Sequence, residues 1–181
     1  EEARADAAGV TSEDRMSVSR TFKTTDITLI ADESQTSGQN VQSATYYFGD
    51  KSYEISDYSF NFQVGTSTKK STSVFFYGTD AARAPDADSE DAMTRSLSYK
   101  NGLTGTQLEA STIVEGAISN LAQLTSDTYY VGLKGEEISN FAYNYQTKKL
   151  ADGTYGNSSA RSTAVYYYDL SATAGIEEAR A

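Results

Sequence analysis

The amino-acid sequence predicts a mainly β protein: two homologous tandem antiparallel β units, each sandwich- or barrel-like, with one α-helix in the second unit. Three observations predict this fold class. The chain contains an internal repeat, its apolar residues alternate with polar ones at a period of two, and turn-forming pairs separate the alternating runs. At 181 residues it is long enough for one domain built from two halves or for two small domains.

The internal repeat is ungapped over 21 residues. Residues 43–63 (SATYYFGDKSYEISDYSFNFQ) align on residues 126–146 (SDTYYVGLKGEEISNFAYNYQ) at an offset of 83, with 11 identities. The match resumes downstream, where STSVFFY at 71–77 corresponds to STAVYYY at 162–168 with an offset of 91. Because the offset changes only between matching blocks, the insertions are expected in loops.

Shorter matches extend the repeat towards both ends. The tripeptide SED occurs at 12–14 and at 89–91, an offset of 77, and EEARA stands at both 1–5 and 177–181. We therefore expect a first β repeat unit, a second β repeat unit with the inserted helix, and the start of a third repeat or a connector, at residues 1–80, 81–176 and 177–181.

Alternation predicts the strands of the first unit. The residues that share one face of each run are Met16, Val18, Arg20 and Phe22, then Ile27 and Leu29 in a partner strand, then Tyr58, Phe60 and Phe62. Residues 74–77 are apolar on both faces, which is typical of a strand in the middle of a sandwich or at an interface.

The second unit repeats this scheme at Phe141, Tyr143 and Tyr145 and again at residues 165–168. Turn chemistry lies between the runs, as pairs that favour positive φ or tight turns: Gly49 with Asp50, Asn101 with Gly102, Asp152 with Gly153, and Gly156 with Asn157. The pair Asn101 and Gly102, flanked by Tyr99 and Leu103, is the strongest hairpin signal.

One segment of the second unit, about 107–124, has helical periodicity. Its apolar residues fit one helical face: Leu108, Ile113, Val114, Ala117, Ile118, Leu121 and Leu124. The corresponding stretch of the first unit, 30–42, is polar, so the helix is expected in the second unit alone. Whether the two units share one core stays open.

Composition excludes several classes of function. The 25 acidic and 15 basic residues give a formal charge of −10, which repels phosphate backbones, so we expect no nucleic-acid partner. No run of about 18 apolar residues is present, so no membrane insertion is expected. The chain has no Cys and no His, which removes the commonest nucleophile, general base and metal ligands.

An acidic cluster lies where the two predicted units meet. Asp86, Asp88, Glu90 and Asp91 could supply oxygens to a Ca²⁺ ion that stiffens this junction. The segment lacks the loop pattern of an EF-hand, and a solvated acidic linker explains the same residues. No other metal or cofactor is predicted.

Two arrangements could suggest catalysis. Glu54 and Glu137 recur in the repeat and could pair as a glycosidase acid and base, but duplication explains them and the chain has no Trp to line a glycan cleft. Ser71 beside Lys69 and Lys70 lacks the spacing of a Ser/Lys dyad, and lysines there would discourage edge pairing of an exposed hairpin.

Tyrosine runs mark the strands. In the pairs Tyr46 with Tyr47 and Tyr129 with Tyr130, and in the triplet 166–168, successive rings face opposite sides, so one ring of each pair is expected in the core. The other is covered by a neighbouring unit, or meets a glycan or another subunit. The tripeptide 157–159 matches an N-glycosylation sequence and is interpreted as a polar hairpin tip.

The tandem, cysteine-free, acidic β units resemble in a general way the repeat arrays of bacterial surface adhesins, and residues 165–181 resemble a stretch of tube-forming proteins of phage tails and secretion systems. The expected function is therefore a non-enzymatic structural or adhesive repeat module of an extracellular or cell- or particle-surface fibre. Its expected partners are adjacent repeat units or copies of itself, with a glycan or cell-surface ligand as a further candidate. The alternative is a self-assembling tube or filament subunit, tail-tube-like or pilus-like, and a glycan-active enzyme is the remote alternative.

Overall fold

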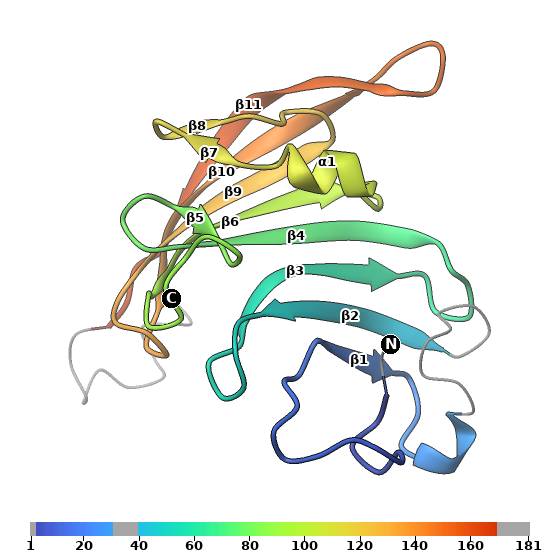
Figure 1. The fold of residues 1–181 in the computed structure, drawn as a ribbon. Coiled ribbons are helices and arrows are strands. Elements are labelled where there is room, and N and C mark those ends of the chain that lie inside the picture. Colours follow the sequence, from blue (N-terminus) through green and yellow to red (C-terminus); the bar gives the residue numbers. More distant parts are fainter. Residues whose placement is uncertain (1–2, 31–39, 170–181) are drawn as a thin grey trace.

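The computed structural model describes residues 3–30 and 40–169 and is mainly β, with one large antiparallel sheet (Figure 1). Its strands are β1 (Val18–Phe22), β2 (Val41–Phe48), β3 (Ile55–Phe62), β4 (Lys69–Tyr77), β5 (Ala82–Arg83), β6 (Met93–Lys100), β7 (Ile113–Val114), β8 (Ala117–Ile118), β9 (Leu124–Val131), β10 (Ile138–Lys149) and β11 (Tyr155–Val165). Helical turns are the 3₁₀-helix η1 (Ile27–Leu29) and the α-helix α1 (Gly105–Glu109).

The strands of the large sheet follow the order β1-β2-β3-β4-β6-β9-β10-β11, and β5 pairs with β4. All of these pairings are antiparallel. The sequence predicted two sandwich- or barrel-like units, whereas in the described residues the strands of both repeats lie in one continuous sheet. Strand content and antiparallel pairing are as predicted.

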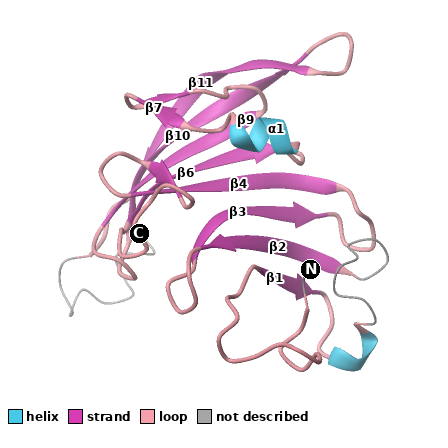
Figure 2. Ribbon diagram, viewed as in Figure 1, coloured by secondary structure: helices cyan, strands magenta, loops and turns pink. Residues whose placement is uncertain are grey.

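One face of the sheet carries the hydrophobic core. Figure 2 shows α1 and the β7–β8 hairpin lying over this face. Leu108 of α1 belongs to the same buried cluster as Val74 and Phe76 of β4 and Leu97 of β6. The cluster also includes Val41, Ala44, Phe60, Phe62, Tyr99, Leu103 and Leu124, and so runs through both repeats. The two repeats therefore share one core, which resolves the question that the sequence left open.

The opposite face of the sheet carries a row of small polar residues, beside a second, smaller buried cluster in which Phe75 packs against Ile55 and Tyr77. One cross-strand row takes a single residue from each strand along the path, namely Ser19, Thr45, Ser59, Ser73, Ser98, Ser126, Asn144 and Ser162. An antiparallel sheet can leave one face in contact with water, and hydroxyl and amide side chains suit that environment. The alternation seen in the sequence therefore separates an apolar, covered face from a hydroxyl-rich one.

The helix predicted over 107–124 is wrong in extent. Thr104 caps α1 in a capping box with Gln107, but the helix ends at Glu109. The β7–β8 hairpin follows, and its turn residues Glu115 and Gly116 have φ of 48° and 80°, the positive values of a type I′ turn. Apolar residues three and four apart fit a helical face, but here they fold onto the sheet as a short helix and a hairpin.

Two further predictions of local structure are corrected. Ile27 and Leu29 form η1 and not a strand, because the carboxylate of Asp26 accepts hydrogen bonds from the backbone and hydroxyl of Thr28 (2.9 and 2.7 Å) and caps the turn. Asn101, with φ of 66°, does not close a hairpin, since its N–H donates to the carbonyl of Lys70 and the chain leaves the sheet towards α1. Among the helices of the described residues, none has the length and apolar character needed to cross a bilayer.

Candidate functional site

The two repeats place corresponding strands in the same order. β1-β2-β3-β4 form one set of four neighbouring antiparallel strands, and β6-β9-β10-β11 form the second. In each set a long connection joins the first strand to the second, through η1 in one and through α1, β7 and β8 in the other. The sequence repeat therefore coincides with a repeat of strand topology.

Side-chain contacts recur at the same offsets. In each set a tyrosine hydroxyl bonds a serine of the first strand, a glutamate accepts from a methionine N–H, an asparagine bonds a serine of the last strand, and a tyrosine hydroxyl donates to a serine carbonyl. The matched pairs are Tyr47–Ser19 and Tyr130–Ser96 (3.1 and 3.1 Å), Glu54–Met16 and Glu137–Met93 (2.9 and 3.1 Å), Asn61–Ser71 and Asn144–Ser162 (3.0 and 3.3 Å), and Tyr77–Ser56 and Tyr168–Ser139 (2.6 and 2.7 Å).

Aromatic triads recur in the same way. Tyr46 and Tyr58 stack with ring centroids 4.6 Å apart, and the corresponding Tyr129 and Phe141 stack at 4.4 Å. A third ring meets each stacked pair edge-on. This ring is Phe60 in the first triad and Tyr143 in the second. Offset-stacked and edge-to-face pairs contribute roughly 0.5–1.5 kcal/mol beyond their buried area, so this packing is part of what stabilises each four-strand set.

The two sets meet at the pairing of β4 with β6. The last strand of the first set lies beside the first strand of the second, with Val74 opposite Leu97 and Phe76 opposite Arg95. Val74, Leu97 and Phe76 have no exposed surface. At this junction the strands of the two sets are continuous, because β4 and β6 pair within one sheet.

The outer edge of β11 lacks such a neighbour among the described residues. At the offset of 91, Val165 corresponds to Val74 and Tyr167 to Phe76. Val165 is 53% exposed and Tyr167 is 90% exposed, where their counterparts are fully buried. In the part of the chain that the structure describes, β1 likewise has a partner strand on one side only. The sheet therefore ends in two edges that correspond to the two sides of its own internal junction.

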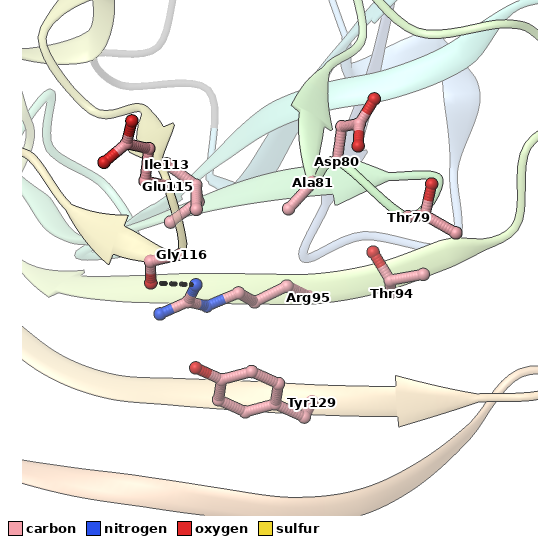
Figure 3. Close-up of a pocket in the computed structure, with 9 residues that line it drawn as sticks. All are labelled: Thr79, Asp80, Ala81, Thr94, Arg95, Ile113, Glu115, Gly116 and Tyr129. Carbon is pink, nitrogen blue, oxygen red and sulfur yellow. Dashed lines mark hydrogen bonds between the residues drawn. The ribbon is translucent and has the colours of Figure 1, made fainter.

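An open pocket of about 460 Å³ lies beside this internal junction (Figure 3). Arg95 of β6 points into it, with Tyr129 of β9 on one side and Gly116 of the β7–β8 turn on the other. The guanidinium donates two hydrogen bonds to Asp127 (2.7 and 2.8 Å) and one to the carbonyl of Gly116 (3.0 Å). Its charge is therefore used to hold the β7–β8 hairpin on the sheet.

Two groups of this pocket, Arg95 and Tyr129, have shifted pKa values. Burial lowers the pKa of Arg95, but the hydrogen bonds and charge of Asp127 outweigh burial and raise the pKa above its ordinary value. Burial, together with the charge of Asp127, raises the pKa of the Tyr129 phenol to about 12. At neutral pH the guanidinium stays charged and the phenol stays neutral, so neither is tuned for proton transfer.

A second buried ion pair secures α1. Arg83 of β5 donates to both carboxylate oxygens of Asp57 (2.7 and 2.6 Å) and to the carbonyl of Leu108 at the end of the helix (2.7 Å). Both side chains are only slightly exposed. Bidentate pairing of a guanidinium with a carboxylate fixes orientation as well as position, so this pair connects β3, β5 and α1.

The predicted calcium residues are engaged in local contacts. Asp88 accepts from the N–H of Glu90 (2.9 Å), Asp91 accepts from the N–H of Asp88 (3.2 Å), and Glu90 pairs with Lys134 at the exposed surface (3.3 Å). Asp86 donates its backbone N–H to the carbonyl of Arg83 (2.9 Å). Across residues 3–30 and 40–169, no group of three or more acidic side chains converges to hold a metal ion. Calcium binding stays a prediction.

The repeated glutamates are not brought together. Glu54 and Glu137 directly precede β3 and β10, which are four strand positions apart in the sheet. At about 4.8 Å per strand their lateral separation is about 19 Å, whereas the carboxylates of glycosidases lie roughly 5–10 Å apart. The N–H of Met16 also lowers the pKa of Glu54, which disfavours a role as general acid.

Ser71 and Lys69 lie on opposite faces of the sheet. Ser71 accepts from the side-chain amide of Asn61 (3.0 Å), while the Lys69 ammonium lies 3.5 Å from the centroid of the Phe60 ring. Asn61 and Phe60 are successive residues of β3, so their side chains point to opposite faces. Burial lowers the pKa of Lys69, but the structure does not place this amine beside the serine hydroxyl.

Residues 157–159 lie inside β11 and not at a hairpin tip. Asn157 forms a bridge with Ala122, and the N–H of Ser158 donates to the carbonyl of Leu121 (2.9 Å). The pair Tyr46 and Tyr47 follows the expected alternation, since Tyr46 packs against the core and Tyr47 contacts Ser19. The expectation is wrong for the triplet 166–168, whose three rings are all exposed.

The buried arginines were not identified from the sequence. A signal for one of them exists: Arg95 occupies an apolar-face position of an alternating strand, between Met93 and Leu97. A charged residue at such a position requires a buried partner. The partner, Asp127, lies 32 residues away and could not be chosen from spacing alone.

Comparison of the chain with protein-family models, with curated proteins and with solved structures finds no match.

Proposed function

We propose that this chain is a non-enzymatic structural module of an extracellular or surface fibre, in which homologous four-strand β units join edge to edge in a continuous sheet. The observation that carries this proposal is the pairing of β4 with β6, where the last strand of one repeat meets the first strand of the next. The recurrence of side-chain contacts at constant offsets supports the assignment of the two strand sets as equivalent units.

The chemistry of the described residues supports a structural role. The one cation that lines the pocket among the described residues, Arg95, is bound to Asp127 and to a backbone carbonyl. The two repeated glutamates lie about 19 Å apart across the sheet and are bound to backbone N–H groups. These arrangements favour structural over catalytic use of the polar residues.

A second candidate is a self-assembling tube or filament subunit. The exposed edge of β11 favours it, because Tyr167 is 90% exposed where its counterpart in the first unit is buried. Both candidates use the same joining of units and differ in whether the next unit is part of the same chain or of another copy. An adhesive role would add a glycan or cell-surface ligand at the tyrosine-rich end of β11.

A tandem fusion tests the proposal. Two copies are joined in one polypeptide, so that residues 166–181 of the first copy and 1–17 of the second connect β11 to β1. This connection is longer than residues 78–92, which connect β4 to β6 within one copy. Lengthening a flexible connection has a small entropic cost, so the junction should still form. Because a shared interface couples neighbouring units, the fusion should melt in one transition at a higher midpoint than the single chain.

The matched control is the same fusion with Val165→Pro in the first copy only, which removes a backbone donor from the joining edge. Its midpoint should return to that of the single chain. If the unmodified fusion melts at the same midpoint as the single chain, its copies are independent and the proposal of edge-to-edge joining is wrong.

A further inference from the structure

We propose that β11 of one molecule pairs antiparallel with β1 of a second copy of this chain, in the register that β4 and β6 use inside the molecule. The inference rests on the proposed edge-to-edge function and identifies the partner, the two strands and their alignment. It starts from the equivalence of the strands: β4 corresponds to 160–168 at the offset of 91, and β6 corresponds to 16–23 at the offset of 77.

One end of the surface that would be covered is apolar. Val165, Tyr166, Tyr167 and Tyr168 are 53%, 43%, 90% and 51% exposed, and Met16 beside β1 is 48% exposed. In the internal junction the counterparts Val74, Phe76 and Tyr77 are buried. Exposed apolar residues along a free sheet edge are a template for pairing with another strand.

The backbone of β11 is oriented for this pairing. The N–H of Tyr166 donates to the carbonyl of Asn140 in β10 (3.0 Å), so it points to the inner side of the strand. Backbone groups of successive strand residues point to opposite sides, and those of Val165, the last residue of β11, therefore point to the outer edge.

The same reasoning applies to β1. The N–H of Lys23 donates to the carbonyl of Asn40 (2.8 Å), and the carbonyl of Ser17 accepts from the N–H of Tyr47 (2.9 Å), both towards β2. By alternation, the backbone groups of Val18 and Phe22 point outward. The two outer edges thus present donors and acceptors in the alternation that an antiparallel pair requires.

The internal register transfers to the contact between copies. In the molecule, Thr72 is opposite Tyr99, Ser73 opposite Ser98, and Phe76 opposite Arg95. The corresponding pairs between copies are Thr163 with Phe22, Ala164 with Thr21, and Tyr167 with Val18. Because the two paired surfaces differ, the contact is heterologous and continues from copy to copy as a ring or an open filament.

The size of the repeat follows from the sheet. Each copy contributes the eight strands of the path from β1 to β11, which at about 4.8 Å per strand is a repeat of about 38 Å along the assembly. The formal charge of −10 makes copies repel each other. Association should therefore be stronger at about 0.15 M salt, where the Debye length is about 8 Å, than at low ionic strength.

Disulfide trapping tests the partner and the register together. The chain has no cysteine, so introduced cysteines are unique. Two separate single variants, Thr21→Cys and Ala164→Cys, are mixed and oxidised. The expected main product is the covalent dimer of the two different chains, because this pair is directly opposite in the proposed register and within the Cα separation that a disulfide needs.

Two controls accompany this experiment. Ser73→Cys with Ser98→Cys in one chain should form the corresponding internal disulfide, since these residues are opposite each other in the structure. Ser19→Cys mixed with Ala164→Cys is out of register by two residues on the same face and should give much less mixed dimer. Equal yields from Thr21→Cys and Ser19→Cys would overturn the register, and only homodimers would overturn the pairing of β11 with β1.

An edge variant tests the non-covalent contact. Val165→Pro removes an outward N–H while Val165→Thr keeps it, and proline is tolerated at such edge positions. In light scattering across a concentration series, the native chain and Val165→Thr should form larger species, and Val165→Pro should stay monomeric with an unchanged circular dichroism spectrum. A strictly monomeric native chain would refute the inference. If the tandem fusion nevertheless melts cooperatively, the proposed joining within one polypeptide stands and only the second copy is excluded.

Discussion

Replacing Asp127 by alanine should lower the free energy of unfolding by about 3–5 kcal/mol, because it leaves the guanidinium of Arg95 buried without its counter-ion. The Arg95 and Asp127 side chains are only 6% and 1% exposed, so the guanidinium is poorly hydrated and loses its main charged partner when the carboxylate is removed. The remaining contacts of Arg95 are the carbonyl of Gly116 at 3.0 Å and the ring of Tyr129, 4.6 Å from the guanidinium carbon. A domain is stable by roughly 5–15 kcal/mol, so this loss would be a large part of the total.

Urea unfolding followed by tyrosine fluorescence and by circular dichroism measures this loss, since the chain has 14 Tyr and no Trp. The matched control is Glu90→Ala, which removes the exposed pair with Lys134 and should change stability by no more than about 0.5 kcal/mol. A second variant combines Arg95→Met with Asp127→Leu. Removing both charges should recover most of the loss, because no unpaired charge is then buried.

Two results would refute this reasoning. Equal losses in Asp127→Ala and Glu90→Ala would mean that burial does not raise the cost of breaking an ion pair here. A double variant as unstable as Asp127→Ala would mean that the loss comes from packing or from the detached β7–β8 hairpin, and not from the unpaired guanidinium.

Three further predictions concern other parts of the fold. Burial raises the pKa of Tyr99 from 10.0 to about 12, so between pH 10 and 12 the folded state keeps a proton that the unfolded state has lost. The contribution of this group to the free energy of unfolding should therefore be complete below pH 10 and decrease between pH 10 and 12. If Tyr99→Phe lost stability equally steeply over this range, Tyr99 would not be the origin of the decrease. Gly132→Ala should destabilise by about 1–3 kcal/mol in urea unfolding, because φ is 129° and the new Cβ would overlap the carbonyl oxygen of Glu136. Gly105→Ala, with open space at the start of α1, should stabilise by roughly 0.5–1 kcal/mol, and the reverse order of these two variants would refute the argument. Calcium should raise the melting midpoint relative to chelator if the acidic segment 86–91 holds the ion as the sequence predicts, and identical midpoints would leave only the solvated acidic linker.

The sequence by itself determined the repeat and the strand content. Eleven identities over 21 residues at one offset indicate a common backbone, and β2-β3-β4 and β9-β10-β11 have the same order in the structure. Alternation of apolar and polar residues also separated the two faces of these strands, because the period of two is a property of a single strand and needs no neighbour.

Local patterns were insufficient between the strands. The apolar residues of 107–124 have a spacing that fits a helix, yet the capped helix α1 stops after Glu109 and a hairpin turns at Glu115 and Gly116. The observed solution buries Leu108 and Leu124 but leaves Val114 58% exposed, so contact with the sheet, and not the apolar spacing, decides the fold of this segment. For the same reason Asn101 and Gly102 do not close a hairpin, since the next strand beside β6 comes only after that excursion.

Only the tertiary structure decided how the two units relate to each other. Composition and spacing describe each strand separately, whereas the pairing of β4 with β6 and the burial of Arg95 against Asp127 depend on residues distant in the sequence. Such contacts form where the free energy gained by burying apolar surface in a shared core exceeds the entropic cost of closing long loops. The local sequence pattern does not predict which of these two terms is larger. The sequence therefore determined that segments of the chain recur, and the structure decided that the strands of these segments lie in one sheet with β1 and β11 at its described ends.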